Sequence, residues 1–341
     1  MLSKIIDEKL IRQLEHIISR SSRIVLVAHE NPDGDAIGSL LGMYHFLKSQ
    51  GKKEVWPMLP NDAPANLQWL PGFDKVVVFN KNAGRGCQLL YTADLILMMD
   101  LNTLDRTGRM ADAIRNSVGV KCLIDHHIHP QVEAAVVISH PEIASTCELV
   151  FRYVCRTEKL DELTRDAATC IYTGMMTDTG NFSYNSCHKE IYLIIYSLLE
   201  KGIDKDWIYR KVNCENTLSR MRMKGYVLSE GMEVLPEYKT VIIRMPKAKL
   251  DEFNAQPGDT DGLVNMPLDI REVVFSAFLR EESDIIRLSF RSTGSFPVNR
   301  IAAEHFEGGG HLNAAGGRFH GSLDEARALL LKILPSYASE L

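Results

Sequence analysis

The chain has no excess of basic residues. Its 341 residues include 39 Lys and Arg against 44 Asp and Glu, which gives a formal net charge of −5. A protein that binds long nucleic acid usually carries a basic excess, because it must neutralise phosphates along the backbone. The composition therefore argues against long duplex DNA as a partner. A nucleic-acid partner, if there is one, should be short and held locally.

The sequence also lacks paired cysteines. Seven cysteines are present, an odd number, and no two of them are spaced as CxxC. This pattern argues against a disulfide framework and against a zinc knuckle. It favours a reducing compartment, so we expect a cytoplasmic protein.

Long apolar runs are missing as well. The N-terminal segment MLSKIIDEKLIRQLEHII predicts an amphipathic helix, because its charges recur too often for the apolar core of a signal peptide. The most apolar later stretch, residues 191–199, falls far short of the length of a membrane span. We therefore expect a soluble protein with no membrane partner.

The length predicts two domains, and the first half alternates short apolar runs with helical periodicity. This alternation is typical of an α/β fold with a parallel sheet covered by helices. The predicted strands are residues 23–28, 75–79, 95–99, 121–124 and 135–139. The predicted helices are residues 35–49, 145–155 and 163–176, and Gly84-Arg85-Gly86 predicts a turn.

The pattern changes twice in the second half of the chain. The predicted domains are an α/β domain at residues 1–190, a helical connector at 191–230 and a smaller α/β domain at 231–341. In the last of these, residues 240–245, 273–280 and 285–291 predict strands, followed by a glycine-rich loop. A helical connector would allow hinge closure of the two domains around a ligand.

Ionisable residues follow three of the predicted strands directly. His29 follows the strand RIVLVA, Asp100 follows LILMM, and Asp125 and His126 follow KCLI. Ligands of open α/β sheets bind at the carboxyl ends of the strands. The three strands therefore bring metal-binding residue types to the same edge, which scattered surface charges would rarely do.

Most of these motifs have a purely structural alternative. Asn-Pro-Asp-Gly, at residues 31–34, is a good turn sequence, and Asp35 could cap the helix that follows. Asp178, in the segment TDTGNF, could likewise cap a helix. The run Asp125-His126-His127 is harder to explain in this way, because burying a carboxylate and two imidazoles without partners is costly.

In their order along the chain, the motifs HENPDGD, MMD, DHH and TDTGNF resemble those of the DHH phosphoesterases. The resemblance covers about the first 190 residues and implies a metal-binding catalytic domain with two divalent cations. It implies that one cation is bound by His29, Asp33 and Asp100. It implies that the second is bound by Asp35, Asp100, His126 and Asp178, with Asp100 as the bridge.

The chemistry of these residues agrees with that implication. Oxygen-rich ligands with some imidazole and no thiolate suit Mn²⁺, the expected metal, or Mg²⁺ better than structural zinc. Two such ions about 3.5–4 Å apart can activate a water and stabilise in-line phosphoryl transfer. His127 would bind the scissile phosphate or protonate the leaving group, and Asp125 would orient a neighbouring imidazole. The expected catalytic residues are Asp100, Asp125 and His127.

The C-terminal half carries a second motif, GGGHLNAAG at residues 308–316. A glycine run is often only a flexible loop, but its backbone amides can also form a site for an anion. Together with the strand-end pair Arg291-Ser292, the motif resembles the DHH-associated C-terminal domain, in which it holds the substrate. The expected substrate-binding residues are Arg106, Arg291, Ser292, Gly309, Gly310, His311 and Asn313.

The overall plan resembles the NrnA-like nanoRNases of this family. Those enzymes degrade very short oligoribonucleotides and remove the 3′-phosphate of 3′-phosphoadenosine 5′-phosphate (pAp), so a short oligonucleotide or nucleotide is the expected substrate. The polarity of cleavage, 3′-5′ or 5′-3′, stays open, and so does a homodimer.

Other members of the family fit the sequence less well. A RecJ-like nuclease is disfavoured, because the chain shows no added nucleic-acid-binding domain and no basic stripe. A pyrophosphatase is disfavoured by the lack of a Ser-Arg-Lys-Lys cluster near the C-terminus, and a cyclic-dinucleotide phosphodiesterase by the lack of membrane and sensor segments. A linear dinucleotide remains open as a substrate. The rival class is a non-catalytic nucleotide sensor, which we would expect to have lost metal ligands.

Overall fold

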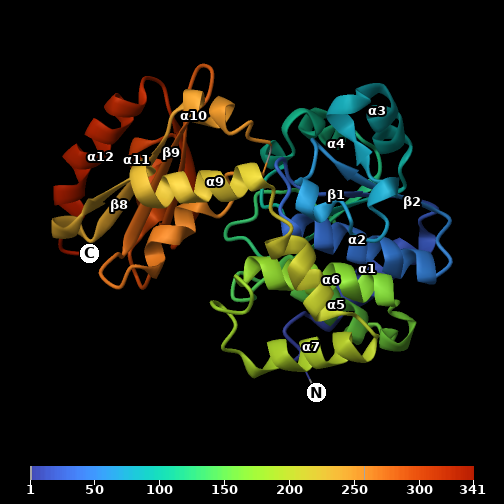
Figure 1. Ribbon diagram of the computed structural model, residues 1–341. Coiled ribbons are helices and arrows are strands. Elements are labelled where there is room, and N and C mark those ends of the chain that lie inside the picture. The colour runs from blue at the N-terminus through green and yellow to red at the C-terminus, as the bar shows by residue number, and fades with distance from the viewer. Residues whose placement is uncertain (1, 257) are drawn as a thin grey trace. The chain divides into compact units, whose positions relative to one another are not determined.

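A computed structural model describes residues 2–256 and 258–341, and the chain forms two compact units (Figure 1). The first unit is Met1–Glu215 and the second is Asn216–Leu341. The segment predicted as a connector is divided between them. Helices α7 (Lys189–Glu200) and α8 (Lys205–Tyr209) belong to the first unit, and α9 (Leu218–Tyr226) belongs to the second.

The first unit contains the predicted parallel sheet. Its strands are β1 (Arg23–Val27), β2 (Glu54–Leu59), β3 (Val77–Val78), β4 (Leu95–Met99), β5 (Val120–Asp125) and β6 (Val136–Ser139). They lie in the order β3-β2-β1-β4-β5-β6, and every neighbouring pair is parallel. Strand β4 is buried at all five positions, which explains its uninterrupted apolar sequence, since both faces of the sheet are covered.

Helices cover both faces of this sheet. One face packs against α1 (Glu8–Arg20), α2 (Gly34–Ser49), α5 (Thr146–Arg156) and α6 (Arg165–Asp178), and the other packs against α3 (Ala83–Thr92) and α4 (Ala111–Arg115). Helices α2 and α6 approach closely because α2 carries glycine at the contact. A Cβ atom added at Gly38 would lie 2.6 Å from the carbonyl oxygen of Cys170. Among the described residues, no helix combines the length and the apolar character that a bilayer crossing requires.

Two local predictions in this unit are wrong. Only Val77–Val78 of the predicted strand 75–79 is extended, and 3₁₀ turns flank it on both sides. The segment Gly84-Arg85-Gly86 is no turn but the start of α3, because the Asn82 side chain caps the helix by accepting from the Arg85 N–H at 3.1 Å. Glycine is needed there for packing, since a Cβ atom at Gly86 would lie 2.4 Å from the Phe79 ring.

The second unit contains a mixed sheet. Its strands are β7 (Met232–Leu235), β8 (Thr240–Met245), β9 (Phe275–Glu281), β10 (Ile286–Ser292), β11 (Gly309–His311) and β12 (Ala314–Phe319). They lie in the order β11-β12-β10-β9-β8-β7, with β8 and β9 parallel and the other pairs antiparallel. Helices α11 (Val298–His305) and α12 (Leu323–Tyr337) pack on one face. Helices α9 and α10 (Lys247–Glu252) pack on the β8 and β9 part of the other face (Figure 1).

The predicted glycine-rich loop is instead part of this sheet. Gly309–His311 forms the edge strand β11, which pairs with β12. Gly310 has φ = 148°, and a Cβ atom there would lie 2.4 Å from the Ala314 carbonyl oxygen. The prediction of a loop failed because these glycines bring two strands close together, while the turn between the strands lies at Leu312-Asn313.

Candidate metal centre and active site

The strand ends of the first unit deliver three of the predicted ligands to one edge of the sheet. His29 lies two residues beyond β1, Asp100 directly follows β4, and His126 directly follows β5. Asp100 has φ = 57°, in the left-handed region that residues with a side chain rarely adopt. Such strain is often found at functional sites, where the surrounding structure maintains it.

Helix ends deliver the other three. Asp33 caps α2, and its carboxylate accepts the N–H groups of Asp35 and Ala36, each at 3.0 Å. Asp35 lies in the first turn of α2 but does not cap it. Its carboxylate instead accepts the backbone N–H groups of Thr146 and Cys147 at the start of α5, at 2.6 and 2.9 Å. Asp178 is the last residue of α6.

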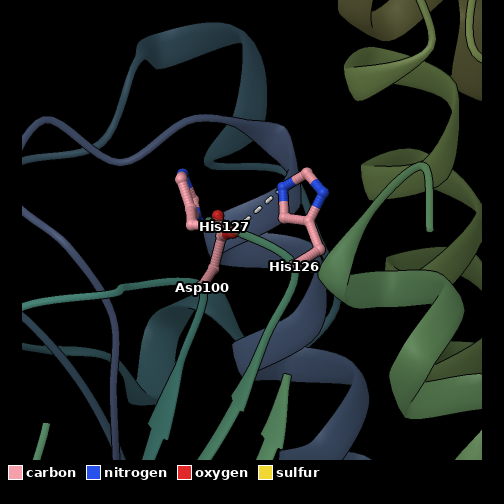
Figure 2. A group of neighbouring side chains, drawn as sticks. All are labelled: Asp100, His126 and His127. Atoms are coloured by element: carbon pink, nitrogen blue, oxygen red, sulfur yellow. Dashed lines mark ion pairs between the residues drawn. The ribbon is translucent and has the colours of Figure 1, made fainter. Parts of the chain in front are cut away.

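The six side chains form two groups that share Asp100. In the first group, Nε2 of His29 lies 3.4 Å from Oδ2 of Asp100 and 3.8 Å from Oδ2 of Asp33. In the second group, Nε2 of His126 lies 3.6 Å from Oδ1 of Asp100. The same nitrogen lies 3.8 Å from Asp35 and 3.5 Å from Asp178. Asp100 therefore turns one carboxylate oxygen toward each imidazole, and Figure 2 shows this carboxylate beside His126 and His127.

The electrostatics of the two groups fit divalent cations. Burial, with the charges of Asp100 and Asp178, raises the pKa of the Asp35 carboxyl well above its usual range. Burial also acts to raise the pKa of Asp100, but the surrounding imidazoles, His29 first, hold it well below its usual range. Nε2 of His29 is buried and makes no hydrogen bond to any described residue. Crowded carboxylates and an unused imidazole nitrogen are what a cation would satisfy. Two groups of these residues, and a third that includes His127, have ligand atoms close enough to hold one.

A chain of hydrogen bonds fixes the second histidine of the motif. Nδ1 of His127 lies 2.7 Å from Oδ1 of the fully buried Asp125, and Nε2 of His127 lies 2.8 Å from Nη1 of Arg106. A guanidinium can only donate, so Nε2 must accept and Nδ1 must carry the proton that is donated to Asp125. Arg106, predicted as a phosphate contact, is thus placed beside the predicted catalytic histidine.

Thr146 is a site residue that the sequence analysis missed. Its hydroxyl donates to Oδ1 of Asp100 at 3.0 Å, while its N–H donates to Asp35. One fully buried residue therefore orients two of the predicted ligands. The available signal was the Ser-Thr pair at the start of the predicted helix 145–155, which follows a strand of the same sheet.

The second unit places some of its predicted substrate-binding residues on one face of the sheet. Arg291 on β10 and His311 on β11 both pair with Ala314 of β12. Directly paired residues project from the same face, so Arg291 and His311 flank Ala314 there. Gly309 and Gly310 lie on β11 beside them.

Ser292 and Asn313 are placed differently. Ser292 is buried, and its hydroxyl donates to the Phe296 carbonyl oxygen at 2.7 Å and accepts the Asn313 side-chain amide at 2.9 Å. The Asn313 amide also donates to the Gly294 carbonyl oxygen at 3.0 Å. These bonds stabilise the turn that follows Arg291. A substrate-binding role for the two residues stays a prediction.

Comparison with known proteins agrees with this division into two units. The sequence model of the DHH family, N-terminal domain, matches residues 23–175 of this chain. The model of the DHHA1 domain matches residues 238–339. A solved structure of an exopolyphosphatase-related protein from Bacteroides fragilis is 47% identical to this chain. It has a TM-score of 0.96, and the match covers 99% of each chain.

Two curated relatives also match most of the chain. The bifunctional oligoribonuclease and PAP phosphatase NrnA of Thermus thermophilus is 29% identical over 315 residues, which are 91% of this chain and 88% of that protein. The protein of the same name from Bacillus subtilis is 26% identical over 321 residues, which are 93% of this chain and 96% of that protein.

Proposed function

This chain belongs to the DHH family, and on that premise we propose that it is a metal-dependent phosphoesterase that hydrolyses short oligoribonucleotides and pAp. The position of Asp100 between two histidine-centred groups carries the proposal. The substrate class is supported by the relatives from Thermus and Bacillus, which are named as oligoribonucleases and PAP phosphatases.

We propose that the two groups hold one divalent cation each. His29, Asp33 and Asp100 would bind the first, and Asp35, Asp100, His126 and Asp178 would bind the second. Mn²⁺ is the proposed metal, with Mg²⁺ as the alternative, because both accept mixed carboxylate and imidazole ligands. Bound cations would supply the positive charge that activates an attacking water and offsets charge developing on the phosphate.

The protein's own residues have distinct tasks in this proposal. Asp125 holds the His127 ring in one orientation, as their 2.7 Å contact suggests. Arg106 binds the scissile phosphate, because its guanidinium already lies at the reactive edge of His127. When Arg106 turns to the phosphate, Nε2 of His127 is released and can take up a proton from solvent; the imidazolium, stabilised by Asp125, then gives this proton to the leaving oxygen.

The second unit is proposed to hold the substrate by a phosphate. Arg291 and His311 lie in one row of the sheet, so both could bind the same anion. The cytoplasm is the proposed setting, since it is a reducing compartment that keeps free cysteines as thiols. Assembly as a homodimer stays open in this proposal.

The test is a substrate panel with Mn²⁺ and, separately, with Mg²⁺. The wild-type chain is incubated with pAp, a linear diribonucleotide, a cyclic dinucleotide and pyrophosphate, and released phosphate and mononucleotide are measured. We expect turnover of pAp and of the diribonucleotide. The Asp100→Ala variant serves as the inactive control for contaminating phosphatases.

Two other outcomes would change the assignment. Turnover of pyrophosphate or the cyclic dinucleotide alone would move the chain to another activity of the same family. Absence of turnover for every substrate, with bound Mn²⁺ confirmed by calorimetry, would favour a nucleotide sensor.

A further inference from the structure

Three arginines lie side by side across the sheet of the second unit. Arg287 on β10 pairs directly with Arg280 on β9 and with Arg318 on β12. Paired residues of neighbouring strands project from the same face, so the three side chains form one row. Arg291 lies on this face too, four residues further along β10. We call Arg280, Arg287 and Arg318 the arginine row.

Without partners, the arginine row would destabilise the sheet, because like charges directly opposite one another repel. Two carboxylates offset part of the repulsion. Glu282 accepts from Arg280 at 2.6 Å and from Arg287 at 3.3 Å, and Glu307 lies 3.2 Å from Nε of Arg318. Three guanidinium groups thus share two carboxylates.

The donors of the row are accessible to a ligand. The side chains of Arg287 and Arg318 are 54% and 60% exposed, and that of Arg280 is 30% exposed. Each guanidinium carries five N–H donors in a planar fork, more than the contacts within the row can use. A ligand with several negative charges would relieve the repulsion and use these donors.

The residues that lie between the row and Arg291 on β10, β12 and β11 are small. Ser289 of β10 pairs with Gly316 of β12, which pairs in turn with Gly309 of β11. A Cβ atom added at Gly309 would meet no atom within 4 Å, so the space above this glycine is open. On β10, β12 and β11 the row is therefore joined to Arg291 by small residues, with Phe278 of β9 beside Ser289 at the border. The small residues leave room for sugars and bases.

The distance between Arg287 and Arg291 indicates how long a ligand must be to contact both. Four residues of β-strand separate Arg287 from Arg291, or about 13 Å at a rise of roughly 3.3 Å per residue. The phosphates of one nucleotide do not span this distance, whereas an extended strand of several nucleotides does. Arginine is also the residue best suited to bidentate contacts with successive phosphates.

We propose that the arginine row binds the phosphates of nucleotides beyond the one held at Arg291, and so sets how well longer oligoribonucleotides bind. This inference rests on the proposed function and adds a second subsite to it. The row was invisible in the sequence, which shows no basic stripe, because its members are brought together only by strand pairing.

The test compares substrates of different length in the double variant R287Q/R318Q. We expect the ratio of kcat/KM for a pentaribonucleotide to that for pAp to fall roughly 10-fold, mainly through KM, the loss expected for two exposed charged contacts. The salt dependence of pentanucleotide binding should weaken by about 1.4 in its logarithmic slope, because each phosphate contact contributes roughly 0.7. The control is R244Q, since Arg244 of β8 pairs with the buried Leu279 and hence projects from the opposite face.

Several outcomes would overturn the proposal. An unchanged ratio would remove the row from substrate binding, and an equal loss for pAp and the pentanucleotide would show that it acts on the fold or on the terminal site. If the wild-type protein cleaves none of the substrates, the proposed function fails. The role of the arginine row is then tested by oligonucleotide binding alone. In that case fluorescence anisotropy of a labelled pentaribonucleotide, without metal, must show tighter binding to the wild-type protein than to R287Q/R318Q.

Discussion

In the first unit the carboxyl groups of Asp35 and Asp100 are buried at one edge of the parallel sheet, each held by hydrogen bonds. In the second unit Arg287 and Arg318 stand exposed on an open sheet face, and their partners are surface carboxylates. Burying an ionised group is costly unless it is paired, so a buried cluster must be built around its ligand. Exposed arginines carry no such requirement, and each contributes little by itself.

This difference has a functional consequence. A buried centre should fail almost completely when a single member is lost, because its parts act as a unit. A surface of exposed cations should lose affinity in small steps, each with a modest salt-dependent effect. Single substitutions in the two units therefore test this difference directly.

The largest effect is expected for Asp100→Ala. Both groups lose a carboxylate oxygen, so kcat should fall on the order of 10³-fold or more, as when a catalytic unit is broken. The measurement is single-substrate kinetics with pAp at saturating Mn²⁺. The matched control is Asp62→Asn, since Asp62 is an exposed partner of Lys81 and should be neutral. An Asp100 variant with full activity would contradict the shared role of this residue.

A smaller loss is expected for Thr146→Val. This change keeps the shape of the side chain but removes the hydroxyl that donates to Asp100. Loss of a group that orients a ligand typically lowers metal affinity or activity about 10–100-fold. The readout is the Mn²⁺ concentration needed for half-maximal activity, and Thr146→Ser should restore it. A variant whose thermal midpoint falls while its Mn²⁺ requirement stays unchanged would make Thr146 merely structural.

Arg291→Ala should act on binding. Removing one charged hydrogen-bonding partner of a phosphate should raise KM for pAp about 10-fold or more and change kcat much less. Arg291→Lys should recover only part of the affinity, because lysine lacks the planar fork. The measurement is kcat and KM for pAp with the wild type, Arg291→Ala and Arg291→Lys. A fall in kcat with an unchanged KM would place Arg291 in the chemical step instead.

The smallest effect is expected at Glu190, whose ion pair with the buried Arg152 includes none of the predicted site residues of the first unit. The hydrogen bond from Arg152 holds the pKa of Glu190 at about 2, below its ordinary 4.5. A depressed folded-state pKa stabilises the fold above the unfolded value, and this contribution is lost as the pH falls from 4.5 toward about 2.

We therefore compare Glu190→Gln with the wild type in urea unfolding at several pH values. The wild type should be more stable by roughly 1 kcal/mol near neutral pH. The value is small because Arg152 keeps a second carboxylate partner, Glu148, when Glu190 is neutralised. The difference should vanish at low pH. A difference that does not depend on pH would exclude the ion pair as its cause.

Much of the fold could be predicted because a buried strand can be recognised from the apolar residues of its own sequence. Strand β4 coincides with the predicted run 95–99, since a strand buried on both faces needs an apolar residue at every position. Strand β2 was missed, because its sequence EVWPML contains Pro57 and proline argues against an inner strand. The glycines of β11 were predicted to form a loop, because the sequence does not show that they pair closely with β12.

The metal centre and the arginine row also differ in how far the sequence predicts them. Each predicted metal ligand of the first site lies just beyond a strand or at one end of a helix, so one topological rule places it at the sheet edge. Thr146 was missed because its role depends on how the start of α5 packs against Asp35 and Asp100. The arginine row depends on the register of three strands, which the spacing of its members in the sequence does not reveal.

The two-cation centre can be tested directly by anomalous scattering from crystals of the protein soaked in Mn²⁺. We expect two manganese peaks on either side of Asp100, one next to His29 and the other next to His126. Crystals with fully ordered side chains at this sheet edge and no manganese among them would contradict it.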